Sequence, residues 1–266
     1  MAIGHRREGP VAVLTLALPP VNALGLSLRR ALHSAFSTLR RDDARAAVIV
    51  GGGNGFSAGG DRTEFGKPAA TARPTLSRDV LDAIEHCGKP VVAALHGFAI
   101  GGGLELALAC SVRVAVADTR IGLPEVGLGR FPLSGSQRLP RLLGIERAAE
   151  WMLRAETMAA GHPDATPLFH RVVDGREALL PVALELARSA LVTAPLPVRN
   201  RPFPDSDPSL ALRAVERRYP EEQRTAAQQA LLAALRAAVE APEFQSGLDR
   251  AQALFDELVS GRPAGR

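Results

Sequence analysis

Aromatic residues, cysteine and lysine are all scarce in this sequence of 266 residues. Phe, Trp and Tyr make up 4% of the chain, which leaves few rings for single-stranded nucleic acid to stack on. Cys87 and Cys110 form no CxxC pair and have no neighbouring His cluster, which excludes a disulfide scaffold and a zinc module and fits a reducing cytoplasm. Lys67 and Lys89 are the only lysines, and the formal net charge of +4 comes from scattered arginines. We therefore expect no nucleic-acid partner.

Apolar runs long enough to span a membrane are also missing. The uncharged stretch 90–104 is rich in glycine and shorter than the roughly 20 residues that a membrane helix needs. Basic residues at 5–7 precede the apolar run Val11–Leu18, as they would in a signal peptide, but this run is short and its alternation is typical of a β-strand. We expect a cytoplasmic protein without a transmembrane helix.

Short apolar runs alternate with helical patterns through the first 200 residues. The runs have the length of buried strands, and glycine turns separate them from stretches with apolar residues at helical spacing. This alternation predicts an α/β layer structure. The expected strands are 11–18, 46–50, 91–95 and 112–117, and the expected helices are 24–40, 76–86 and 104–109.

From about residue 200 onward the sequence pattern becomes helical. The segment Arg201–Asp205 reads as a linker, and Asp207 and Pro208 suit the N-cap and first position of a helix. We predict a core at 1–200 and a helical C-terminal region at 201–266. The expected helices of this region are 209–219, a second from Pro220 through Val239, and a third that Gly247 precedes and that ends near Gly261.

Two glycine signatures overlap after the second expected strand. Residues 53–58 fit GxGxxA, but the glycines that follow are poor helix formers, which disfavours a dinucleotide fold. Residues 55–59 fit GxSxG, the nucleophile elbow of α/β-hydrolases, with His162 and His170 downstream. That elbow requires a strand directly before the serine and a helix directly after it, whereas a glycine loop separates Val50 from Ser57. A hydrolase remains an alternative.

Three longer motifs occur together and in a fixed order. They are GFSAGGD at 55–61, HGFAIGGGLELALAC at 96–110, and GLPEVGLG at 122–129 with SQRLPRLLG at 136–144; PVNAL at 20–24 and RVV at 171–173 accompany them. Together they resemble the crotonase superfamily of enoyl-CoA hydratases and isomerases. The resemblance implies a crotonase-type ββα spiral core, an acyl-CoA thioester as substrate, and a homotrimer or hexamer.

The resemblance also implies an active site. It assigns the backbone amides of Gly60 and Gly102 to an oxyanion hole, which would stabilise the negative charge on the oxygen of a thioester enolate. It assigns proton transfer to Glu105 and Glu125, and Glu105 lies among apolar residues where a carboxylate without a function or a partner would be costly to bury. The residues expected to bind substrate are Ala23, Leu24, Ala58, Asp61, Gly101 and Pro132.

These assignments favour an enoyl-CoA hydratase that adds water across the 2,3-double bond, with no metal and no redox cofactor. An isomerase using Glu125 alone is one alternative. A catalytically idle acyl-CoA binding protein is another, since Arg130 and Leu133 depart from the family pattern and would reshape the pocket. The tail after residue 195 resembles the hydratase half of bifunctional hydratase/3-hydroxyacyl-CoA dehydrogenases. No length remains in this sequence for a Rossmann domain, so we expect no NAD chemistry.

Overall fold

The computed structural model describes residues 2–193 and 195–261. The chain forms two compact units. Unit 1 comprises Met1–Ile121 and Met158–Pro197, and unit 2 comprises Gly122–Thr157 and Val198–Arg266. The sequence-based division at residue 200 stays a prediction.

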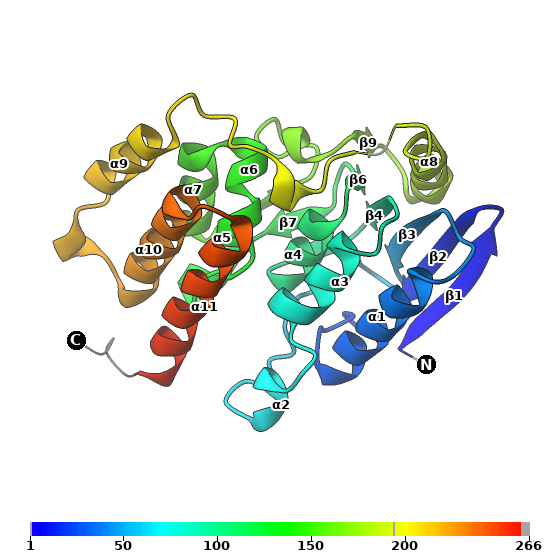
Figure 1. Ribbon diagram of the computed structural model, residues 1–266, viewed down its shortest axis with the longest axis horizontal. Helices are drawn as coiled ribbons and strands as arrows, with labels where there is room; N and C mark the ends of the chain where they lie inside the picture. Colours follow the sequence, from blue (N-terminus) through cyan, green and yellow to red (C-terminus); the bar gives the residue numbers. More distant parts are fainter. Residues whose placement is uncertain (1, 194, 262–266) are drawn as a thin grey trace. The chain divides into compact units, whose positions relative to one another are not determined.

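A six-stranded sheet forms the centre of unit 1, in the order β1-β2-β3-β4-β6-β9 (Figure 1). The strands β2, β3, β4, β6 and β9 pair in parallel, and only β1 pairs antiparallel, with β2. Register places Val13 opposite Val48, and Val48 opposite Val92. Both faces of the inner strands are buried, which explains why they appear in the sequence as continuous apolar runs. The strand bounds are β1 Ile3–Glu8, β2 Val11–Leu16, β3 Ala46–Gly51, β4 Val91–Leu95, β6 Val112–Val116 and β9 Arg171–Val173.

Helices cover this sheet. The helix α8 (Arg176–Ser189) packs against β3, β4 and β6 and contributes Leu179, Ala183 and Ala187 to the core. The helices α1, α3 and α4 form a row in which α3 contacts both α1 and α4 (Figure 1). The other helical bounds in unit 1 are α1 Leu26–Leu39, α2 Pro68–Thr71, the π-helix η1 Leu76–Val80, α3 Leu81–Glu85, α4 Gly102–Ala109 and the 3₁₀ turn η3 Thr166–Leu168.

A small second sheet has the strand order β5-β7-β8, with bounds Phe98–Ile100, Arg120–Gly122 and Thr157–Ala159. The chain leaves unit 1 within β7 and returns within β8. The strand β5 leads directly into α4, so this sheet fixes the point at which α4 begins.

Unit 2 is mainly helical. The helices α10 and α11 pack along each other, and the buried Gln137 ties α5 to α10 by donating from Nε2 to the carbonyl of Ala234 at 2.9 Å. The side chain of Asp205 accepts a hydrogen bond from the amide of Ile145 at 3.0 Å, which connects the expected linker to the start of α7. The bounds are η2 Pro124–Leu128, α5 Gly135–Arg138, α6 Pro140–Leu143, α7 Ile145–Arg154, η4 Val198–Asn200, α9 Pro208–Arg218, η5 Glu221–Gln223, α10 Ala226–Glu240 and α11 Phe244–Ser260.

The structure confirms the strands expected near 46, 91 and 112, and the helix that Asp207 caps by accepting from the amide of Leu210 at 2.9 Å. The helix expected at 76–86 is also found, as a π-helix at Leu76–Val80 that continues into α3 at Leu81–Glu85. Two helix predictions were wrong in their bounds. The helix expected from Pro220 begins instead at Ala226, where Thr225 and Gln228 form a capping box. The last helix begins at Phe244, so Gly247 lies inside it.

Candidate functional site

The loop after β3 and the start of α4 lie against each other in unit 1. Ser57 forms a parallel bridge with Ala99, and the amide of Ile100 donates to the carbonyl of Ser57 at 3.0 Å. Gly59 has a φ of +88°, and a Cβ at this position would lie 2.6 Å from the carbonyl oxygen of Ile100 and 3.0 Å from the amide nitrogen of Gly102. Glycine is therefore required at residue 59 by both its backbone conformation and its surroundings.

The structure brings the amides of Gly60 and Gly102 together. A Cβ built on Gly102 would lie 3.5 Å from the amide nitrogen of Gly60. Neither amide has a hydrogen-bond acceptor within the residues that the structure describes. Gly102 is the first residue of α4, where N–H groups have no intrahelical acceptor and the helix dipole favours negative charge. The two amides thus lie near each other, and their use as donors to one thioester oxygen stays a prediction.

Glu105 lies one turn into α4 from Gly102. All eight residues of this helix are buried, and Glu105 itself is 6% exposed. Residues three apart lie on neighbouring positions of a helix surface, so the carboxyl group and the Gly102 amide belong to the same end of α4. A carboxylate in such surroundings is a candidate for proton transfer.

Asn22 holds the loop before Gly59 in place, a role that the sequence analysis did not assign. Its side chain is 1% exposed, its φ is +49°, and its Oδ1 accepts from the amide of Leu18 at 2.9 Å. Its Nδ2 donates to the carbonyls of Gly52, Gly55 and Phe56 at 2.9–3.1 Å. A buried side chain with this many backbone partners fixes the conformation of the loop. In the sequence, only the motif PVNAL at 20–24 pointed to this residue.

Ser57 is used as a structural residue. It is fully buried, its hydroxyl donates to the carbonyl of Asn22 at 2.7 Å, and the same oxygen accepts from the amide of Gly59 at 3.1 Å. The strand β3 ends at Gly51, six residues before Ser57, and the next helix, α2, begins only at Pro68. The GxSxG segment therefore lacks the strand–serine–helix geometry of a nucleophile elbow.

The expected substrate-binding residues of unit 1 surround the same loop. The amide of Leu24 donates to the carbonyl of Gly59 at 2.8 Å, and the amide of Ala58 donates to that of Val21 at 3.0 Å. Asp61 follows Gly60 and accepts from the amide of Thr63 at 2.9 Å. Ala23 adjoins Leu24, and Gly101 precedes Gly102 with a φ of +54°. Their contact with a substrate stays a prediction.

The remaining predicted residues lie in unit 2. Glu125 is part of η2, is partly buried, and accepts at its backbone carbonyl from the amide of Arg130 at 3.0 Å. Pro132 is buried beside Phe131, whose ring contacts that of Phe255 edge-on with centroids 5.5 Å apart. The pairing of Glu125 with the glutamate of unit 1 stays a prediction.

The cysteines do not have the environment of nucleophiles. Burial raises the pKa of the Cys110 thiol far above its ordinary value and also raises that of Cys87. Both thiols are therefore protonated and unreactive at neutral pH. Within residues 2–193 and 195–261, no three His, Cys, Asp or Glu side chains are grouped to hold a metal ion. No described helix is both long and apolar enough to cross a membrane.

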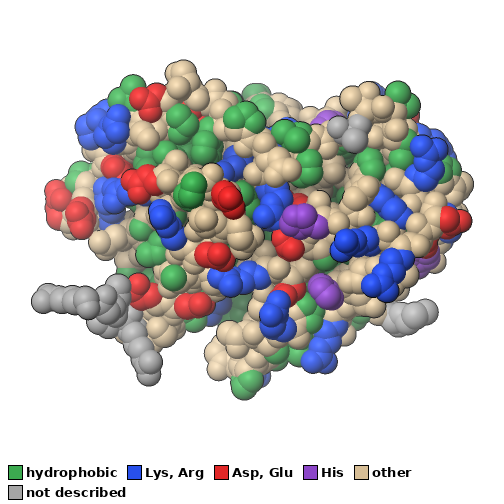
Figure 2. Space-filling view, in the orientation of Figure 1, with side chains coloured by type: hydrophobic (Ala, Val, Ile, Leu, Met, Phe, Trp, Pro, Cys, Tyr) green, Lys and Arg blue, Asp and Glu red, His purple; other side chains and the backbone are tan. Residues whose placement is uncertain are grey.

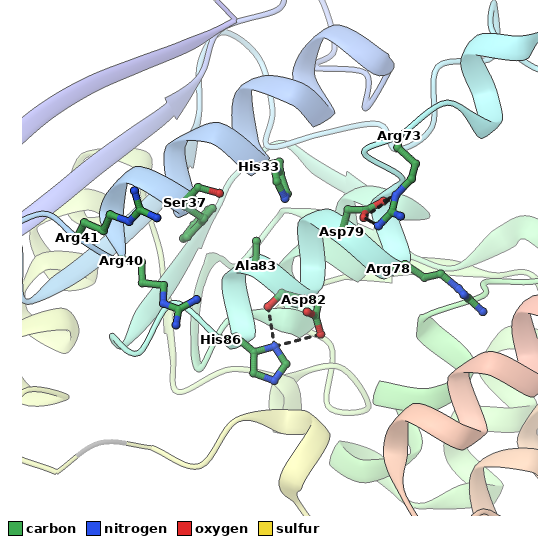
Figure 3. A pocket seen from close by; sticks show the side chains of 11 residues that line it. His33, Ser37, Arg40, Arg41, Arg73, Arg78, Asp79, Asp82, Ala83 and His86 are labelled. Atoms are coloured by element: carbon green, nitrogen blue, oxygen red, sulfur yellow. Dashed lines mark hydrogen bonds and ion pairs between the residues drawn. The ribbon is translucent and has the colours of Figure 1, made fainter.

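A separate surface cleft of about 530 Å³ lies between α1 and the η1–α3 segment. Basic and His side chains gather over these helices (Figure 2), and Figure 3 shows His33 and Arg40 opposite Asp82 and His86. The carboxylate of Asp79 pairs with the guanidinium of Arg73, and Nδ1 of His86 lies 3.1 Å from Oδ1 of Asp82. None of the predicted site residues lines this cleft.

Comparison with known proteins gives consistent matches. The family model described as enoyl-CoA hydratase/isomerase matches residues 6–200. The peroxisomal bifunctional enzyme of Homo sapiens is 36% identical over 271 residues, covering 99% of this chain and 37% of that protein. A probable enoyl-CoA hydratase of Bacillus subtilis (strain 168) is 42% identical over 146 residues, covering 53% of this chain and 57% of that protein. The chain thus spans 37% of the length of the human relative.

Solved structures with the same fold include OdaA of Pseudomonas aeruginosa, with a TM-score of 0.66, 25% identity, and coverage of 95% of this chain and 98% of that one. An enoyl-CoA hydratase of Bacillus anthracis has a TM-score of 0.67 and 24% identity, covering 98% of this chain and 92% of that one. At this identity the match is evidence for the fold of this chain and for nothing further. The expected α/β crotonase-type fold with a helical C-terminal region is confirmed.

Proposed function

This chain belongs to the enoyl-CoA hydratase/isomerase family, and on that basis we propose that it hydrates 2-enoyl-CoA thioesters. The observation that carries the proposal is the proximity of the Gly60 and Gly102 amides, with Glu105 one helical turn from Gly102. This arrangement suits a reaction in which negative charge develops on a thioester oxygen.

The proposed reaction adds the hydroxyl group of water to C3 and a proton to C2 of the enoyl group. Addition at C3 shifts electrons toward the thioester carbonyl, whose oxygen becomes negative as the enolate forms. The Gly60 and Gly102 amides would donate to this oxygen. Of Glu105 and Glu125, one accepts the proton that water loses and the other supplies the proton that C2 gains.

The acid–base steps and the amide donors account for this reaction with protein groups alone, so the proposal includes no metal and no redox cofactor. We extend it to β-oxidation of fatty acids, because multifunctional proteins named for that process are among the relatives, including one from Cucumis sativus that is 37% identical over 175 residues. A homotrimer or hexamer also stays part of the proposal.

Replacing each glutamate with glutamine tests the proposal. Glu105→Gln and Glu125→Gln keep the side-chain volume and remove the proton carrier, so each should lower kcat for hydration by about 10²–10⁴-fold while acyl-CoA binding is retained. Glu177→Gln, on the exposed surface of α8, is the matched control. A variant with wild-type turnover would remove its glutamate from the mechanism.

Two results would replace the hydratase proposal. If only Glu125→Gln is inactive and a 3-enoyl-CoA is the better substrate, the protein is an isomerase. If the wild-type protein binds acyl-CoA but converts neither substrate, it is an idle binding protein.

A further inference from the structure

A buried arginine, Arg29, is the fourth residue of α1. It is 6% exposed, although arginine is rarely this buried unless its guanidinium is fully engaged. Its nitrogens donate to four backbone carbonyls and one carboxylate. The acceptors are Pro74 (Nε, 3.0 Å), Leu24 (Nη1, 3.1 Å), Ala69 (Nη2, 2.6 Å), Ala72 (Nη2, 3.4 Å) and Glu64 Oε2 (Nη1, 3.3 Å).

These acceptors come from two segments far apart in sequence. One is Leu24, two residues before the start of α1, and the other is the stretch 64–74, which follows the Gly60 loop. The planar fork of a guanidinium bonds several acceptors in fixed directions, which an ammonium group does not. Arg29 therefore fastens the segment after Gly60 to the first turns of α1.

Glu64 adds a second link between the same two segments. Its Oε1 accepts from the amide of Leu26 at 2.8 Å, at the N-terminus of α1, where a carboxylate is favoured by the helix dipole. A Cβ on Gly25 would lie 2.8 Å from this oxygen, so the absence of a side chain at residue 25 allows the close approach.

Leu24 connects this cluster to the amide of Gly60. Its carbonyl accepts from Arg29, and its own N–H donates to the carbonyl of Gly59 at 2.8 Å. The Gly59 carbonyl and the Gly60 N–H belong to the same planar peptide unit. A hydrogen bond on one side of this unit therefore sets the direction of the N–H on the other side, and it also polarises that N–H as a donor.

We propose that Arg29 is a positioning residue, which acts through Leu24 and the Gly59 carbonyl to aim the Gly60 amide at the thioester oxygen. The inference rests on the proposed function. Arg29 itself does not contact the substrate. Its removal leaves Gly60 present but frees the peptide unit to rotate, and small misplacements of a catalytic donor lower rates strongly.

The test compares Arg29→Met with Arg30→Met. Arg30 is the neighbouring, exposed arginine of the same helix, so its variant carries the same change in charge and side chain without breaking the cluster. For Arg29→Met we expect kcat for hydration to fall by about tenfold or more and KM to change by less than about threefold. Arg30→Met should match the wild type in both. Arg29→Lys keeps the charge but reaches fewer carbonyls, and its kcat should lie between the two.

A spectroscopic readout separates positioning from a merely structural role. Butanoyl-CoA labelled with ¹³C at the thioester carbonyl is saturated, so it binds without being hydrated. In wild-type protein and in Arg30→Met, the carbonyl stretch should move to lower frequency on binding, and in Arg29→Met this shift should be clearly smaller. If Arg29→Met does not fold, Arg29→Lys and Glu64→Gln provide the same comparison.

The outcomes distinguish the two proposals. A full carbonyl shift in Arg29→Met, with only a lower melting temperature, would show that Arg29 is structural and would overturn the inference alone. No carbonyl shift in the wild-type protein would overturn the proposed function, and the inference with it.

Discussion

Replacing Gly59 with alanine should disrupt the arrangement of the Gly60 and Gly102 amides. The backbone at residue 59 has a φ of +88°, and the new Cβ would lie 2.6 Å from the Ile100 carbonyl oxygen and 3.0 Å from the Gly102 amide nitrogen. Both neighbours are backbone atoms, so neither moves by rotating a side chain. The loop must therefore shift away from the start of α4.

Two contributions to the effect have different sizes. A non-glycine residue in the left-handed region costs about 1–2 kcal/mol of stability. If the shift removes one of the two hydrogen bonds to the oxyanion, the transition state loses about 3–4 kcal/mol of stabilisation, which corresponds to a 10²–10³-fold fall in kcat. We expect Gly59→Ala to be moderately less stable and to lose most of its hydration activity.

Gly88→Ala is the matched control, because Gly88 has a φ of +75° but no atom within 4 Å of its added Cβ. It should show a similar loss in the free energy of unfolding, measured by urea denaturation, with kcat unchanged. Hydration of 2-butenoyl-CoA, followed by the loss of enoyl absorbance, gives the rates. Equal kcat values for Gly59→Ala and Gly88→Ala would refute the reasoning that the Gly60–Gly102 spacing matters.

Three further predictions concern the residues around this loop. Ser57→Ala should lower stability by about 1–3 kcal/mol, because the Gly59 amide loses its acceptor, while kcat stays within about tenfold of the wild type; an acyl adduct on Ser57 detected by mass spectrometry would contradict this. Asn22→Leu should lower the free energy of unfolding by at least about 3 kcal/mol, since three loop carbonyls lose their donor, and thermal denaturation checks the loss. Burial lowers the pKa of His96, so its contribution to stability is complete above pH 6.5 and is lost as the pH falls toward the lowered pKa. Urea denaturation at pH 7 and pH 5 should therefore show a larger loss for the wild type than for His96→Gln, and equal losses would exclude the effect.

The inner strands were predictable because their sequence pattern matches their environment. Residues 91–95 are apolar without interruption, and the structure buries this strand on both faces. The strand β1 was missed because half of its six residues are exposed and its His and Arg side chains hide the pattern. Only its pairing with β2 identifies it as a strand. A strand defined by its partner leaves little signal in its own sequence.

Two helix starts in the C-terminal region were predicted wrongly, because the local sequence offers more than one residue at which a helix could begin. Pro220 suits a first helical position, but Thr225 and Gln228 satisfy two backbone donors reciprocally and set the start of α10 instead. Gly247 resembled a residue preceding a helix, yet it lies inside α11, where a Cβ would be 3.2 Å from the carbonyl oxygen of Ala237. The glycine suits the close packing of α11 on α10, and packing between helices is not readable from local sequence.

Within the site, the sequence indicated the glycines and missed the residues that hold them. Gly60 and Gly102 belong to recognisable motifs, and the structure brings their amides together. Arg29 and Arg30 are adjacent arginines on an amphipathic helix, and the neighbouring sequence does not show which of the two is buried. Its partners lie 35–45 residues away, apart from Leu24, so only the fold shows its role.

The most direct measurement is hydration of a panel of 2-enoyl-CoA thioesters of increasing chain length in water enriched in ¹⁸O, with products identified by mass spectrometry. The account predicts 3-hydroxyacyl-CoA carrying one ¹⁸O atom at C3, formed by the wild-type protein and lost in Glu105→Gln. Conversion of a 3-enoyl-CoA to its 2-enoyl isomer without ¹⁸O incorporation, or binding of every thioester without turnover, would contradict it.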